Sequence, residues 1–170
     1  GDIKPTISDM EDMKLYQWES RNMPAIKSEP YMSELVDVAP TLSISSIPDW
    51  KYISHWYKDL TTNKLKSDFV LKQTISQLLK GKENASAMEK ARIFYNYILE
   101  NISYSNVAFL HSNYVPQKAS RTITTRLGDC KDVATLFVSL CRESGIKANL
   151  VLISTRDNGY NRLVLPTIDF

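Results

Sequence analysis

The segment "GDCKDVATLFVSLCRESGIKANLVLIST", residues 128–155, decides how the rest of the chain is interpreted. Apolar residues recur at helical spacing over 133–141, which predicts an amphipathic helix that begins near Cys130 and ends at Gly145. The residues that follow, 146–155, are rich in branched apolar side chains and predict a strand. A cysteine therefore stands in the first turn of a predicted helix, directly after "GD" and before "KD".

Cys130 is placed where a thiol can become a nucleophile. The first turn of a helix has unpaired backbone N–H groups and the positive end of the helix dipole, and both favour a thiolate. The same N–H groups can stabilise an oxyanion on an attacked carbonyl. Gly128 permits a tight turn and close approach of a substrate. Asp129 is a suitable N-cap and Asp132 lies in the first turn, although both acids also oppose thiolate formation.

The second cysteine, Cys141, has a different setting among Phe137, Val138 and Leu140. Free cysteine is among the most buried residue types, so we expect Cys141 to belong to the core. A buried, inert thiol is also the alternative interpretation of Cys130, whose polar neighbours disfavour it. On one helix the two cysteines would lie about 16 Å apart, at about 1.5 Å per residue. A disulfide needs Cα atoms within about 7 Å, so we expect no bond between them.

The composition narrows the class of protein. A chain of 170 residues that is 43% hydrophobic can bury one domain's core. Its 21 basic and 19 acidic residues are scattered, which argues against nucleic-acid binding. No run of about 18 apolar residues is present, so no membrane span is expected. The two histidines, His55 and His111, show no zinc-ligand spacing and no calcium loop is visible, so no metal or other cofactor is expected.

Three amphipathic helices are predicted ahead of the Cys130 segment. Each has an apolar stripe at helical spacing and a capping residue at its start. They are residues 50–60 after Asp49, residues 69–79 after Ser67 or Asp68 and before Gly81, and residues 86–102 with a capping box of Ser86 and Glu89.

The remaining segments are predicted to be extended or irregular. Residues 11–47 contain three prolines and mix aromatic with polar side chains, and 42–47 alternate as in a half-buried strand. We therefore expect residues 1–47 to be the C-terminal strands of a β-rich domain or a linker, and 48–170 to form the core. Asn158-Gly159 predicts a hairpin, with the partner strand in the "RLVLP" that follows.

These motifs resemble the bacterial transglutaminase-like superfamily, which has a papain-like core. The resemblance covers residues 11–170 and is most specific at a G-x-C-x-D helix start followed by a GI-x-A turn and a strand. The matching residues are Gly128, Cys130, Asp132, Gly145, Ile146 and Ala148. The resemblance implies an α+β fold in which helices pack on an antiparallel sheet, with N-terminal strands from a preceding β domain.

The resemblance also implies a mechanism. The family uses a Cys-His-Asp triad, in which cysteine attacks an amide or ester carbonyl and forms a thioester. Hydrolysis or transfer of the acyl group to an amine completes the reaction, so a peptide or protein amide is the expected substrate. Cys130 takes the nucleophile's position, with backbone N–H groups stabilising the oxyanion. Asp132 belongs to the same motif, and Tyr104 occupies an upstream aromatic position that implies a wall of the active site.

The sequence departs from the family at the histidine. The triad histidine and acid are expected after the predicted hairpin, about where the chain ends in "LVLPTIDF". His55 and His111 do not match that position, although His111 follows Tyr104 in a loop that could approach a cleft. We therefore expect an incomplete, inactive core whose open sheet edge favours self-association. An exported or periplasmic location is implied by the resemblance alone.

Two other functions are compatible with the sequence. One is a papain-like binding module for a peptide or cell-envelope component, without turnover. The other is a plain helical structural domain, which predicts that Cys130 is fully buried and lacks a neighbouring cleft.

Overall fold

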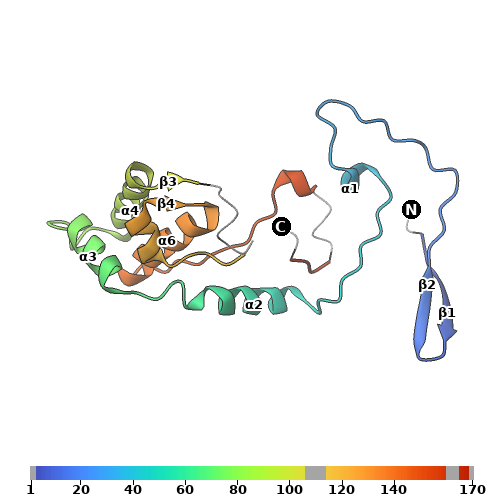
Figure 1. The fold of residues 1–170 in the computed structure, drawn as a ribbon, viewed down its shortest axis with the longest axis horizontal. Helices are drawn as coiled ribbons and strands as arrows, with labels where there is room; N and C mark the ends of the chain where they lie inside the picture. Colours follow the sequence, from blue (N-terminus) through green and yellow to red (C-terminus); the bar gives the residue numbers. More distant parts are fainter. Residues whose placement is uncertain (1–2, 106–113, 160–164, 169–170) are drawn as a thin grey trace.

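The computed structural model describes residues 3–105, 114–159 and 165–168 (Figure 1). A helical body occupies one end of the molecule and contains α3 (Phe69–Leu78), α4 (Ala87–Asn101) and α6 (Cys130–Glu143). A two-stranded hairpin lies at the other end. The Cys130 segment therefore belongs to the body, far from the hairpin.

The helices begin where their capping residues predict. The Asp49 side chain accepts a hydrogen bond from Tyr52 N at the start of α2 (Trp50–Thr62). Asp68 caps α3 through Leu71 N, and α4 opens with the predicted capping box of Ser86 and Glu89. Each cap satisfies a backbone donor that has no partner inside its helix, which stabilises the first turn. The three predicted helices are confirmed.

The core lies where α3, α4 and α6 meet α5 (Ala119–Thr125). Phe94, Leu136 and Leu140 are completely buried there. Burying each such side chain contributes about 1.5–3 kcal/mol relative to leaving it in water. Cys141, 2% exposed, belongs to the same cluster, so the prediction that it is a core residue is confirmed.

Helix α5 was not predicted. Its sequence, ASRTITT, contains three threonines and an isoleucine, which are weak helix formers. Packing supplies what local propensity lacks, because α5 contacts α6 and α3 and buries Ala119 and Thr122 completely or nearly so. Arg126, with φ of 57°, ends the helix and turns the chain toward Gly128.

Two small sheets are present among the described residues. Next to the helices, β3 (Ser103–Tyr104) pairs in parallel with β4 (Leu127–Gly128), through Ser103 N to Arg126 O and Ser105 N to Gly128 O. At the far end, β1 (Thr6–Met10) and β2 (Met13–Gln17) form an antiparallel hairpin whose ten residues are all exposed. The predicted α+β class is confirmed.

Two strand predictions differ from the structure. Residues 42–47 are not a strand; they follow the one-turn helix α1 (Leu35–Val38), and Ile44 is 79% exposed. Residues 146–155 pair with no other described segment, so the expected antiparallel sheet is not seen. Apolar alternation supplies a face to bury, but a strand also needs a hydrogen-bonded neighbour.

The described residues do not form the predicted Asn-Gly hairpin turn. A 3₁₀ turn, η2 (Arg156–Asn158), occupies this position and ends at Gly159, whose φ is 78°. Gly159 lies so close to α1 that a Cβ there would meet Val36 Cγ1 at 2.3 Å. Most of the proposed partner strand, residues 162–166, lies outside the described residues.

No helix within the described ranges is long and apolar enough to cross a membrane.

Candidate active site

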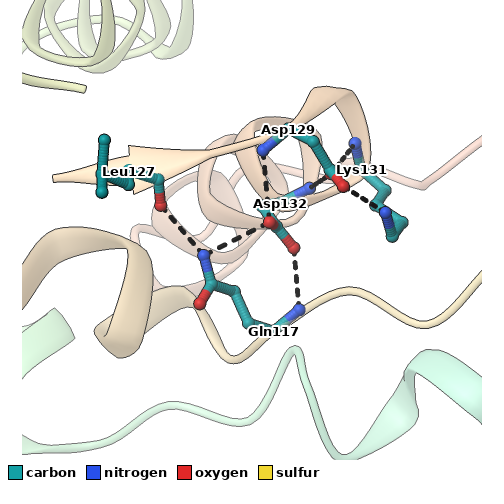
Figure 2. A network of polar contacts seen from close by, with 5 residues as sticks. All are labelled: Gln117, Leu127, Asp129, Lys131 and Asp132. Atoms are coloured by element: carbon teal, nitrogen blue, oxygen red, sulfur yellow. Dashed lines mark hydrogen bonds and ion pairs between the residues drawn. The ribbon is translucent and has the colours of Figure 1, made fainter. Parts of the chain in front are cut away.

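Asp129 caps the helix that carries Cys130. Its Oδ1 accepts hydrogen bonds from Lys131 N at 3.0 Å and Asp132 N at 3.1 Å, and its other oxygen forms an ion pair with Lys131 Nζ (Figure 2). Burial opposes ionisation of this carboxyl, but the Lys131 ammonium and the two backbone donors outweigh it. The pKa of Asp129 therefore lies below its ordinary value. The predicted N-cap is confirmed.

Asp132 faces inward rather than toward a substrate. It is 1% exposed, and its Oδ2 accepts from Asp129 N at 3.2 Å, which completes a capping box. Its carboxylate also receives two donors from Gln117: the backbone N–H at 2.8 Å and the side-chain Nε2 at 3.2 Å. The same Nε2 donates to Leu127 O at 2.9 Å (Figure 2). Asp132 thus joins the first turn of α6 to the segment before α5.

Cys130 lies on the open side of this network. Its side chain is exposed, and it forms no disulfide. The structural-domain alternative required a fully buried Cys130, and that requirement is contradicted. Within the described residues the N–H groups of Lys131 and Asp132 are taken by Asp129, whereas the N–H of Cys130 has no partner. Of these three N–H groups in the first turn, that of Cys130 alone remains available to another acceptor within the described residues.

Gly128 is required for packing. It is buried, and a Cβ there would lie 2.9 Å from Asp132 Cβ and 3.2 Å from Thr122 Cγ2. A side chain would therefore push β4 away from both α5 and α6. The sequence interpretation, a tight turn and close approach of a substrate, missed this internal contact.

Tyr57, on α2, is linked to the site by its electrostatics. Burial raises the pKa of its hydroxyl, and the negative charge of Cys130 raises that pKa further. The preceding residue, Trp56, meets the Tyr114 ring edge-on, with ring centroids 5.4 Å apart. Helical spacing alone predicts that Trp56 and Tyr57 belong to an apolar stripe. It does not identify which segment that stripe faces.

Tyr104 lies beside the motif, as its upstream position implied. It pairs with Gly128 in the β3–β4 ladder, and its side chain is 65% exposed. Cys141 lies at the opposite end of α6, where burial raises the pKa of its thiol. Tyr104 and Asp132 thus lie at the Cys130 end of the helix.

Neither histidine is placed beside Cys130 by the described residues. His55 is exposed on α2 and makes no hydrogen bond to Cys130 within the described ranges. His111 lies outside the described residues. Among the side chains that the structure describes, no group of three His, Cys, Asp or Glu could hold a metal ion.

The fold and site define an α+β protein with an exposed thiol at the start of a buried helix. Residues 72–164, more than half of the chain, match the family model of the transglutaminase-like superfamily. The chain therefore belongs to the transglutaminase-like superfamily. Comparisons with curated proteins and with solved structures give no match.

Proposed function

We propose that Cys130 is the nucleophile of a thiol-dependent acyl transfer or amide hydrolysis, with a peptide or protein amide as the acyl donor. The observation that supports this most directly is the exposed thiol in the first turn of α6, beside its own unpaired N–H group in the described residues. Membership of the transglutaminase-like superfamily supports the same class of chemistry.

The proposed first step forms a bond between Cys130 Sγ and the substrate carbonyl carbon. The carbonyl oxygen gains negative charge, and the Cys130 N–H can stabilise it by donating a hydrogen bond to it. Collapse of this intermediate breaks the carbon–nitrogen bond, the amine leaves with a proton, and a thioester remains. Water or a second amine then attacks the thioester and regenerates the thiol. Tyr104, which pairs with Gly128 just before the nucleophile, serves as a wall for the acyl group.

An activated acyl donor tests the nucleophile without depending on a general acid. A p-nitrophenyl ester has a good leaving group, so an accessible thiolate can be acylated without help from histidine. The chain would be incubated with p-nitrophenyl acetate at pH 6 and 7.5, and the acylated residue would be located by peptide mass spectrometry. We expect one acetyl group on Cys130, formed faster than on free N-acetylcysteine at pH 6.

Two variants make the test specific. Cys130→Ser should lose rapid acetylation, whereas the control Cys141→Ser should retain it, because Cys141 is buried in the core. Reaction of Cys130 no faster than free cysteine would overturn the nucleophile assignment and favour the binding-module alternative. Turnover of an unactivated peptide amide by the chain would overturn the expectation that this segment is inactive.

We also propose that residues 1–47 are separable from the core at 48–170. The wholly exposed β1–β2 hairpin supports this, because a two-stranded hairpin is at best marginally stable alone in water. The segment does contact the core, through α1 against Gly159 and from Ser45 Oγ to Pro166 O at 2.6 Å. A chain of residues 48–170 should therefore have a thermal midpoint slightly below that of the longer chain, and a large loss would contradict the boundary. Sedimentation analysis of both lengths tests the predicted self-association.

A further inference from the structure

Gln117 connects three segments around Cys130: its own segment before α5, β4 and the first turn of α6. Its backbone N–H and its Nε2 both donate to the carboxylate of Asp132, at 2.8 and 3.2 Å. Nε2 also donates to Leu127 O, at 2.9 Å, on the strand that leads into the motif. One carboxamide therefore holds both sides of the turn that presents Cys130 (Figure 2).

We infer that Gln117 is a positioning residue for Cys130, which rests on the proposed function of that thiol. The carboxamide does not act on the substrate; it acts through Asp132. Asp132 in turn accepts from Asp129 N at 3.2 Å, and Asp129 accepts from the N–H groups of Lys131 and Asp132. This chain of hydrogen bonds orients the peptide units on both sides of Cys130.

The arrangement selects which backbone donor stays available. Two of the N–H groups after Cys130 are satisfied by Asp129, so they cannot serve a substrate without breaking the cap. If the Gln117 contact is lost, Asp132 keeps only part of its partners, and the turn has more freedom to rotate. A buried carboxylate that loses a donor is also costly, which favours rearrangement of the turn.

The segment that carries Gln117 is itself anchored at its other end. The Tyr114 ring contacts Trp56 of α2, and the Tyr114 hydroxyl donates to Ile168 O at 2.6 Å. Pro116, between the two anchors, is fully buried. The segment that carries Gln117 is therefore fixed by contacts other than those with Asp132. A positioning group needs such independent support.

The experiment compares Gln117→Ala and Gln117→Glu with the wild-type chain. Gln117→Ala keeps the backbone donor and removes Nε2, whereas Gln117→Glu keeps the shape but replaces the donor with a carboxylate facing Asp132. The matched control is Gln77→Ala, an exposed glutamine on α3. Rates of Cys130 alkylation by iodoacetamide would be measured from pH 5 to 9, with hydrogen exchange of residues 129–133 and the thermal midpoint.

We expect the alkylation rate of Cys130 at pH 7 to fall at least about threefold in Gln117→Ala and further in Gln117→Glu. Without the Gln117 side-chain hydrogen bonds, the turn that carries Cys130 is held less firmly in its reactive geometry. The pH profile should move to higher pH, and exchange at 129–133 should accelerate. Gln77→Ala should match wild type in all three measurements. A lower thermal midpoint with an unchanged pH profile would show a structural role only and overturn the inference.

The outcomes separate this inference from the proposed function. If wild-type Cys130 reacts like a free thiol, the proposed nucleophile fails, and with it the positioning role. If wild-type Cys130 is reactive and both Gln117 variants retain its rate and profile, only the positioning role fails. If a variant does not fold, hydrogen exchange in Asp132→Asn, which keeps the side-chain shape, decides whether this network orders the turn: unchanged exchange at 129–131 overturns the inference.

Discussion

The two ends of helix α6 carry one cysteine each and place them in opposite environments. At the N-terminal end, Cys130 is exposed above a network of polar contacts that uses Asp129, Asp132 and Gln117. At the C-terminal end, Cys141 is buried in the hydrophobic cluster to which α3, α4 and α5 also contribute side chains. The same amphipathic helix is thus packed into the core at one end and leaves its thiol exposed to solvent at the other.

This difference shows how a reactive group can be held without being covered. Hydrophobic burial fixes the axis of α6, but it would also remove a thiol from any substrate. At the polar end, hydrogen bonds satisfy the buried carboxylate of Asp132 and fix its geometry, while Cys130 stays open to solvent. The following predictions test this division, from the largest expected effect to the smallest.

Removing a core side chain near Cys141 should have the largest effect. Leu140→Ala should lower the free energy of unfolding by about 2–5 kcal/mol, because Leu140 is completely buried and its loss leaves a cavity. Urea unfolding followed by circular dichroism measures this. The matched control is Leu99→Ala on α4, where the side chain is 64% exposed and the cost should stay within about 0.5 kcal/mol. Equal costs would refute the assignment of the core to this end.

The two thiols should differ strongly in alkylation under native conditions. Cys130 should react with iodoacetamide at least about a hundredfold faster than Cys141, since Cys141 requires local opening of the core. Burial also raises the pKa of Cys141, which lowers its thiolate fraction at neutral pH. Peptide mass spectrometry of a time course gives both rates. In urea the two rates should converge, and a difference that persists after unfolding would contradict the burial explanation.

A methyl group at Gly128 should disturb the polar end. Gly128→Ala should cost about 1–3 kcal/mol, because the new Cβ meets Asp132 and Thr122 inside normal contact distance. We expect a lower urea midpoint together with slower alkylation of Cys130. An unchanged midpoint would show that β4 can shift away from α6 without cost, and that the close contact does not explain the glycine.

The Asp129 cap predicts a modest dependence of stability on pH. Its folded-state pKa is lowered, so its contribution is complete above the ordinary value of about 3.9 and is lost as the pH falls through the folded value. At pH 7, Asp129→Asn should be less stable by about 0.5–1 kcal/mol, because Asn can still cap the helix but loses the ion pair with Lys131 and the favourable charge at the helix N-terminus. Urea unfolding at several pH values should show this gap shrinking below about pH 4. A stability difference between wild type and Asp129→Asn that widens in acid would contradict the lowered pKa of Asp129.

Local sequence patterns determined much of the helical body. Capping residues and apolar spacing were sufficient for α2, α3, α4 and α6, because each depends on contacts within a few residues of the chain. The same reasoning separated the buried Cys141 from Cys130, since their immediate neighbours differ in polarity. It also located the motif that places the chain in the transglutaminase-like superfamily.

Tertiary structure decided what local patterns could not. The weak helix formers of α5 become helical because α6 and α3 cover them, while 146–155 lack a paired neighbour in the described residues despite a strand-like pattern. Gln117 reaches Asp132 across 15 residues, and the charge of Cys130 raises the pKa of Tyr57 on a separate helix. The sequence by itself determined that a thiol starts a helix here. Which groups hold that thiol in place depends on contacts between distant segments, and only the folded chain brings those segments together.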